Sequence, residues 1–181
     1  MKKIVLGLFA LCAVWFIVFL FTMGYFNQAV VSEQEMGPFR LVYQEHTGSY
    51  RQAGRIQDLV ADKLRTQYDV RTFKGFSILY DDPETKSPNE LKSSLGCIVE
   101  PSDYPKLDQV AQEFAVVEYP VKRYMVVEFP FKDTVSVLFG PYKALPALEH
   151  YQKSKNYKRT PRMEIYDFQN RKIIYMMEIQ A

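Results

Sequence analysis

The same order of predicted elements occurs twice along this chain, and that order limits the folds that it can adopt. In the first half, residues 39–45 have strand composition, and residues 50–66 place apolar side chains at helical spacing. Two further strands are predicted over residues 76–80 and 93–100. The order strand, helix, strand, strand then recurs, which predicts two related halves that share one sheet.

The second half predicts the same kinds of element, but Gly140-Pro141 interrupts its predicted helix. Ser49 and Asp133 are suitable N-cap residues for the two helices, because their side-chain oxygens can accept a backbone N–H. Gly140-Pro141 is predicted to kink the second helix or to mark its true start. The closest match between the halves is residues 78–81 (ILYD) against residues 164–167 (EIYD). The predicted elements of this half are strands over 114–120, 123–131, 162–167 and 172–180 and a helix over 133–154.

Residues 4–26 carry no charged side chain, and they predict a membrane-spanning helix. A helix of this length would be about 34 Å long, which is enough to cross the hydrocarbon core of a bilayer. The run continues past Cys12 with bulky residues and lacks the small-residue exit of a cleavable signal peptide. We therefore expect the lipid bilayer to be a partner of residues 4–26, followed by a tether over 27–37 and a domain over 38–181.

The charges that flank this apolar run predict its orientation. Lys2 and Lys3 precede it, and no basic residue follows it until Arg40. By the positive-inside rule the N-terminus stays in the cytoplasm and the domain faces outward. The expectation is a single-pass protein of the bacterial inner membrane, with its C-terminal domain in the periplasm.

Charge balance and cysteine content argue against several classes of function. Without Lys2 and Lys3, the 21 remaining basic residues equal the 21 acidic ones, so no field that attracts nucleic acid is expected. Cys97 is the only cysteine of the domain, and with His46 and His150 it does not make a ligand cluster. We expect no disulfide framework, no metal site and no cofactor.

A pair of carboxylates, Asp81 and Asp82, follows the predicted strand over residues 76–80. Paired carboxylates are compatible with acid–base catalysis or with a hard metal ion. Asp-Asp-Pro before a polar loop is also ordinary turn chemistry, in which the side chains accept backbone N–H bonds. We expect the pair to end the strand.

Several motifs, taken in order, resemble the GyrI-like domain, a small-molecule-binding fold. They are HTGSY over residues 46–50, YDDP over residues 80–83 and LKSSLG over residues 91–96. Residues 129–167 look most like the membrane-anchored branch of this family, which includes a mammalian testis-expressed ER-phagy receptor. The resemblance covers about residues 38–178.

The resemblance implies an α+β fold. Duplicated strand-helix-strand-strand units, about residues 38–100 and 114–180, would form a curved antiparallel sheet with helices on one face and a ligand cleft between the repeats. In soluble relatives aromatic residues line that cleft, and a buried glutamate meets a cationic ligand or, in one branch, supports hydrolysis.

The function implied is a membrane-anchored domain that binds a small amphipathic or cationic ligand, or a protein partner, without catalysis. The alternative is a hydrolase that uses a cleft glutamate to activate water. Because the chain ends at Ala181 without the receptor's long tail, an autophagy role is not expected.

Glu164 and Glu178 are two candidates for the cleft glutamate, and the sequence leaves the choice open. Glu164 matches the family's strand pattern, although alternation is equally compatible with a solvent-facing side chain. If the repeats are aligned so that Glu178 matches Cys97, Glu178 occupies the position of the family's inward-facing glutamate. If Tyr175 sets the alignment instead, that position falls on Ile173 or Ile174 and no acid is present there. No catalytic residue is assigned. The predicted aromatic ligand-binding residues are Tyr50, Tyr80, Tyr142 and Tyr166.

Overall fold

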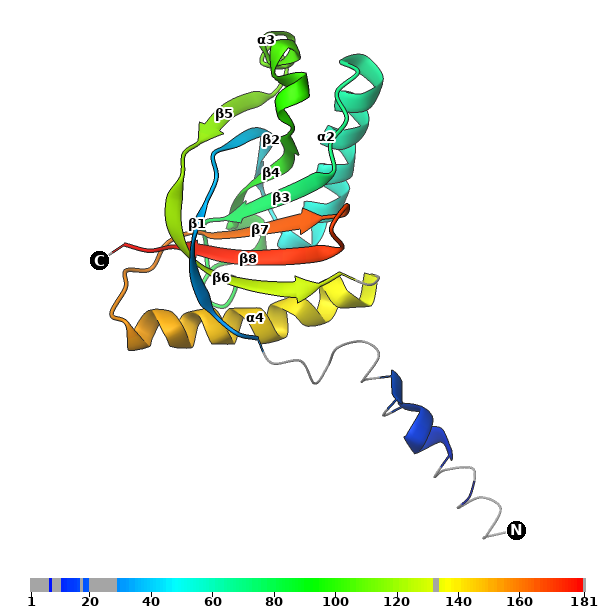
Figure 1. Cartoon of the computed structure of the whole chain (residues 1–181), viewed down its shortest axis with the longest axis vertical. Coiled ribbons are helices and arrows are strands. Elements are labelled where there is room, and N and C mark those ends of the chain that lie inside the picture. The colour runs from blue at the N-terminus through cyan, green and yellow to red at the C-terminus, as the bar shows by residue number, and fades with distance from the viewer. Residues whose placement is uncertain (1–6, 8–10, 17, 20–28, 132–133, 181) are drawn as a thin grey trace.

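A computed structural model describes residues 7, 11–16, 18–19, 29–131 and 134–180 (Figure 1). The predicted anchor over 4–26 therefore lies largely outside the described residues, and so does the predicted cap Asp133. In the part of the chain that is described, none of the helices combines the length and the apolar character needed to cross a bilayer.

The described residues form one sheet with two long helices and several short helical turns. The strands are β1 Ser32–Met36, β2 Phe39–Thr47, β3 Lys74–Leu79, β4 Lys92–Val99, β5 Ala115–Tyr119, β6 Lys122–Pro130, β7 Arg162–Asp167 and β8 Lys172–Glu178. The helices are α2 Ala53–Gln67, α3 Leu107–Val110 and α4 Thr134–Ser154, and the 3-10 turns are η1 Tyr50–Gln52, η2 Pro88–Glu90 and η3 Pro101–Lys106.

Most of these elements match the predicted ones, and the differences are local. Ser49 accepts a hydrogen bond from the backbone N of Arg51 at the start of η1, which leads directly into α2. The helix α4 continues through Gly140-Pro141 without a break. Part of the predicted tether, Ser32–Met36, instead forms β1, an edge strand whose polar sequence gives little strand signal.

The sheet has the order β1-β6-β8-β7-β3-β4-β2-β5, and every neighbouring pair is antiparallel. One half consists of β2, α2, β3 and β4, and the other of β6, α4, β7 and β8. The two halves meet where β3 pairs with β7. The predicted α+β class and curved antiparallel sheet are thus confirmed.

The two edge strands are exchanged between the halves. β1 precedes the first half but pairs with β6, and β5 precedes the second half but pairs with β2. The two connections touch where they cross: Gly37 has a φ of +103°, and a Cβ there would lie 3.0 Å from the carbonyl oxygen of Pro120. This exchange ties each half to the other and helps to close the sheet into a half-barrel.

Side-chain alternation divides the sheet into a helix face and an inner face without helices. One row of paired residues crosses five neighbouring strands. In order from β2 through β4, β3 and β7 to β8, it consists of Val42, Cys97, Gly75, Tyr166 and Ile173. These positions therefore share one face. On it, α2 packs at the Val42 and Cys97 end and α4 packs at the Ile173 end, so both helices cover the same face, as predicted.

The inner face is covered by buried apolar side chains, and Figure 1 shows the curvature of the sheet that carries them. Ile78 belongs to this face, whereas Glu164 lies on the helix face. The matched segments 78–81 and 164–167 are therefore not equivalent in the fold. The buried residues of the inner face are Leu41, Phe76, Ile78, Ile98, Tyr124, Val126, Met163, Ile165, Ile174 and Met176.

The close approach of β2 and β4 gives a test of this packing. A Cβ on Gly96 would lie 2.0 Å from the carbonyl oxygen of Val42, so Gly96→Ala forces backbone to move. We expect this change to lower the free energy of unfolding by about 2–3 kcal/mol in urea denaturation. Gly54→Ala in α2 is the matched control, because nothing lies within 4 Å of its Cβ. The control should be neutral or stabilising by up to about 1 kcal/mol; equal losses in both variants would contradict the packing.

Candidate functional site

Glu164 lies near the middle of β7, on the helix face of the sheet. Its neighbours across the strands are Ser77 on β3 and Tyr175 on β8. Only 6% of the residue is exposed. The sheet therefore holds one carboxylate in the buried region between the two helices.

Both oxygens of this carboxylate have partners from its own strand. Tyr166 donates its hydroxyl to Oε2 over 2.8 Å, and Nε of Arg162 lies 3.1 Å from Oε1. Residues two apart on a strand share a face, which is why all three side chains meet. A buried charge is tolerated when it is paired in this way, so Arg162 acts as the built-in counter-ion of Glu164.

The hydroxyl groups beside Glu164 are sealed by α4. Burial raises the pKa of Tyr166, and the adjacent Glu164 raises it further. Burial likewise raises the pKa of Tyr175, whose hydroxyl has no hydrogen-bond partner among the described residues. A Cβ on Gly140 would lie 2.3 Å from that hydroxyl, so only glycine lets α4 pack this closely. Both phenols therefore remain neutral at physiological pH.

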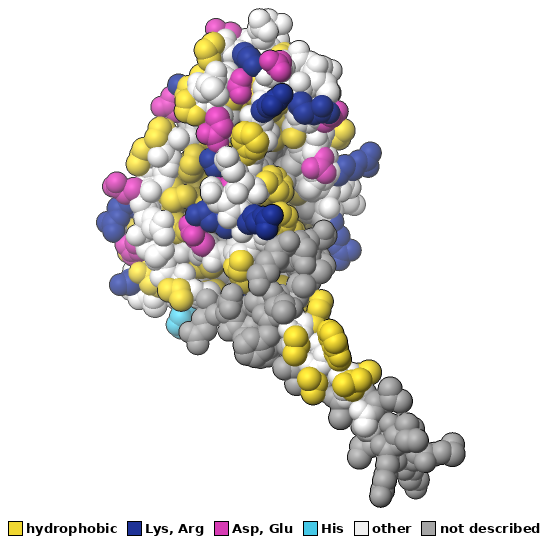
Figure 2. Space-filling model, turned by 45° about the vertical axis from the view of Figure 1, so that its right-hand side comes forward, with side chains coloured by type: hydrophobic (Ala, Val, Ile, Leu, Met, Phe, Trp, Pro, Cys, Tyr) yellow, Lys and Arg dark blue, Asp and Glu magenta, His cyan; other side chains and the backbone are white. Residues whose placement is uncertain are grey.

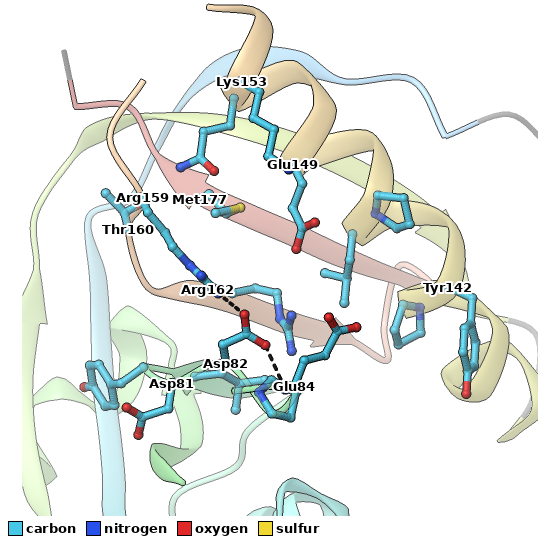
Figure 3. A pocket seen from close by; sticks show the side chains of 17 residues that line it. Asp81, Asp82, Glu84, Tyr142, Glu149, Lys153, Arg159, Thr160, Arg162 and Met177 are labelled. Carbon is cyan, nitrogen blue, oxygen red and sulfur yellow. Dashed lines mark hydrogen bonds and ion pairs between the residues drawn. The ribbon is translucent and has the colours of Figure 1, made fainter. Parts of the chain in front are cut away.

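A pocket of about 520 Å³ opens beside this buried pair, between α4 and the loop that joins β3 to β4 (Figure 3). Arg162 lines it from the sheet, next to Met177. Pro141, Leu145 and Pro146 of α4 supply an apolar wall. The pocket thus combines one hydrophobic side with a charged rim.

The loop side of the pocket is fixed by Asp81 and Asp82. Asp82 accepts hydrogen bonds from Arg159 over 2.8 Å and from the backbone N of Glu84 over 2.9 Å, and both lower its pKa. Lys86, over 2.8 Å, and the backbone N of Lys92, over 2.7 Å, lower the pKa of Asp81 in the same way. The pair ends β3 and shapes the loop, as predicted. Within the described residues, no group of three or more His, Cys, Asp or Glu side chains is arranged to hold a metal ion.

Not all the charged groups of the rim are neutralised. Asp82 pairs with Arg159, and Arg162 pairs with Glu164. Glu84 and Glu149 form no ion pair within the described part of the chain, and Figure 3 shows both carboxylates directed into the pocket. The pocket therefore presents two free carboxylates beside an apolar wall, with Lys153 at its edge as a single free cation among the described lining residues.

The predicted tyrosines do not form one cluster around Glu164. Tyr166 contacts it directly, whereas Tyr80 and Tyr142 line the outer pocket, where Tyr142 is 80% exposed. Tyr50 instead supports the loop, since its hydroxyl donates to the carbonyl oxygen of Asp81 over 3.0 Å. Of the four tyrosines, the structure therefore brings Tyr166 alone to the buried glutamate, because the β3–β4 loop holds Tyr50 and Tyr80 at the end of the strand.

The structure separates the two candidate glutamates. Glu178 lies on β8 and is paired with Tyr124 of β6, so its side chain belongs to the inner face. It forms an ion pair with Lys122 over 2.9 Å. It therefore cannot share a site with Glu164. Sequence reasoning missed Arg162, although strand alternation places it on the same face as Glu164. It also missed Glu149, which carries no motif of its own.

The amino-acid sequence of this chain is similar to that of two mammalian proteins. No protein-family model matches the chain. Testis-expressed protein 264 homolog of Mus musculus is 27% identical over 135 residues, which are 70% of this chain and 41% of the mouse protein. Testis-expressed protein 264 of Homo sapiens is 28% identical over 135 residues, 70% of this chain and 40% of the human protein. The match thus spans about two fifths of each curated relative.

Solved structures show the same fold at low identity. SAV2435 bound to tetraphenylphosphonium has a TM-score of 0.52 at 14% identity, covering 84% of this chain and 94% of that one. The C-terminal domain of EcmrR has a TM-score of 0.55 at 9% identity, covering 84% and 98%. The fold is GyrI-like. A hydrolase from Listeria innocua also shares it, with a TM-score of 0.51 at 10% identity over 90% and 98% of the chains.

These findings bear on two further expectations. The relatives from mouse and human argue against the expected bacterial inner-membrane location. The GyrI-like resemblance is supported, but the names of these relatives carry no statement of an ER-phagy role.

The buried pair gives a stability prediction. Arg162→Met leaves the carboxylate of Glu164 buried without its counter-ion, and we expect the free energy of unfolding to fall by about 3 kcal/mol. The double variant Arg162→Met/Glu164→Gln removes the charge but keeps an acceptor for Tyr166, so its loss should be only about 1–2 kcal/mol. Urea denaturation at pH 7 measures both. A double variant that is less stable than Arg162→Met would contradict the pairing.

Proposed function

We propose that this domain binds a small amphipathic cation in the pocket between α4 and the β3–β4 loop, without converting it chemically. The observation that carries this proposal is the combination of an apolar wall with two unpaired carboxylates, Glu84 and Glu149, around one cavity. Apolar surface favours the hydrophobic part of such a ligand, and the carboxylates favour its charge.

The size of the pocket favours a small molecule over a protein partner. Sites for small molecules usually enclose about 300–1,000 Å³, and this pocket measures about 520 Å³. A structure of the same fold is described with tetraphenylphosphonium, a hydrophobic cation. At 14% identity that neighbour shares only its fold with this chain. We therefore propose the ligand class from the pocket of this chain, and the neighbour's ligand supplies a probe for testing it.

The buried glutamate has an indirect role in this proposal. Because Arg162 already neutralises Glu164, the counter-charge for a ligand comes from the rim rather than from the buried acid. Arg162 then separates the ligand from Glu164 and limits how deeply a cation enters.

Hydrolysis is the second candidate function, and the hydrolase with the same fold is the observation that favours it. A general base must offer a free lone pair to the water that it activates. Glu164 is only 6% exposed and does not line the pocket, where Arg162 lies instead, so a water molecule bound in the pocket does not reach this carboxylate. Binding without turnover is therefore the better-supported function.

The proposed anchoring rests on the sequence. We propose that residues 4–26, which carry no charge over a length that suits a bilayer, hold the domain at a membrane.

Calorimetric titration of the full chain with tetraphenylphosphonium tests the ligand proposal. We expect saturable binding that weakens about threefold to tenfold in Glu149→Gln and in Glu84→Gln, because each change removes one rim charge worth about 0.6–1.4 kcal/mol to a nearby cation. Glu90→Gln is the matched control, since Glu90 is exposed in the same loop but does not line the pocket.

A second measurement separates binding from hydrolysis. A screen of ester and strained-ring substrates should show no turnover that Glu164→Gln abolishes. Turnover lost in that variant would establish the hydrolase instead. Equal affinity in all the glutamine variants would overturn the rim carboxylates as the cation site.

A further inference from the structure

Three phenylalanines gather at one end of the sheet. The rings of Phe131 and Phe168 meet edge to face with centroids 5.6 Å apart. The backbone N of Phe168 donates to the carbonyl oxygen of Phe73 over 3.1 Å, which brings the third residue to the same place. Phe168 is 53% exposed and Phe73 is 43% exposed. Large exposed aromatic side chains that cluster in this way mark an interaction surface.

The strand register explains why these residues share one end. Lys74, Asp167, Lys172 and Pro130 lie side by side across β3, β7, β8 and β6. The three phenylalanines stand one residue beyond this row, where the strands begin or end. We call Phe73, Phe131 and Phe168, with Arg71 and Arg171, the aromatic end of the sheet.

The aromatic end is also basic. Arg71 and Arg171 are exposed, and neither forms an ion pair with any described residue. The backbone of Arg171 is fixed beside the phenylalanines, because its carbonyl oxygen accepts the N–H of Phe131 over 2.8 Å. Figure 2, which turns this side of the molecule forward, shows hydrophobic, basic and acidic side chains mixed over the visible face.

Most other charged groups nearby are paired. Lys172 pairs with Glu128 over 2.7 Å, and Lys74 pairs with Glu100 over 2.8 Å. The carboxylate of Asp167 is buried and accepts two hydrogen bonds from the uncharged Asn170, so it forms no ion pair among the described residues. The two exposed arginines outnumber this one carboxylate, and the aromatic end is positively charged.

The residues before the N-terminal strand lead toward this same end. β1 is antiparallel to β6, with Ser32 opposite Val126, so the residues before Ser32 lead in the direction in which β6 runs toward Phe131. Ala29 and Val31 pack in the same apolar cluster as Phe131. The chain therefore enters the described part of the domain at Ala29, on the side of the aromatic end.

We propose that the aromatic end lies on a phospholipid surface that contains anionic lipids. Aromatic rings at the headgroup level, flanked by arginines, are the combination that binds such a surface. The ligand pocket lies toward the opposite ends of β3 and β7, about 17 Å along six strand residues, and so faces away from the bilayer. This surface goes beyond the ligand proposal and depends only on membrane attachment.

A single tryptophan reports whether this surface contacts lipid. The chain has one tryptophan, Trp15, so the full-length double variant Trp15→Phe/Phe168→Trp carries a single reporter at the aromatic end. In vesicles of brominated phosphatidylcholine with one quarter phosphatidylserine, we expect at least half of its fluorescence to be quenched. Trp15→Phe/Tyr80→Trp is the control at the pocket end and should lose less than one tenth. Trp15→Phe/Phe73→Trp is a second reporter if the first variant does not fold.

The unchanged chain distinguishes failure of the docking from failure of the anchor. Quenching of Trp15 with no quenching at residues 168 and 73 would leave the anchor standing and overturn the docking. Absence of quenching at all positions would overturn both. Adding Arg71→Glu/Arg171→Glu to the Trp15→Phe/Phe168→Trp variant should halve the quenching at residue 168. The same two charge reversals in the otherwise unchanged chain should leave the quenching of Trp15 unaltered. Unchanged quenching at residue 168 would overturn the role of the anionic lipid, and a surface that binds another protein would leave residues 168 and 73 unquenched.

Discussion

The pairing of β3 with β7 is the interaction on which the rest of this structure depends. It joins the two halves into one sheet, and it places the middle of β7 under the space between α2 and α4. Alternation then directs Arg162, Glu164 and Tyr166 into that space. Because a lone carboxylate there would be costly, the strand carries its own counter-ion and hydrogen-bond donor. The chemistry of the site follows from this one register.

The same register explains why the pocket lies at one end of the interhelical space rather than in its centre. Toward the centre, Gly140 lets α4 descend onto Tyr175 and exclude a ligand. Toward the end of β3, the ion pair between Asp82 of the first half and Arg159 of the second joins the loop to the second half. The pocket is therefore a product of both halves. Its wall comes from α4, and its carboxylates come from α4 and from the loop.

Much of the fold could be predicted from the sequence, because helical and strand periodicities are local properties. The strand around Ile78 and the helix around Val60 show this. The face of each side chain could not be predicted, because it depends on pairing between distant strands. Glu164 and Glu178 are both acids in apolar strands, yet register places them on opposite faces. The exchanged strand β1 was also missed, since a polar edge strand needs only one partner and no apolar face.

The central claim is that a hydrophobic cation binds between α4 and the β3–β4 loop, above Arg162. Backbone amide shifts of the isotope-labelled chain, recorded by NMR during addition of tetraphenylphosphonium, test this claim most directly. The largest changes should fall on residues 80–84 and 142–153 and on the Nε signal of Arg162, while the inner-face strand residues around Glu178 stay unchanged. Changes that instead centre on Glu178 and Lys122, or no saturable changes at all, would contradict the account.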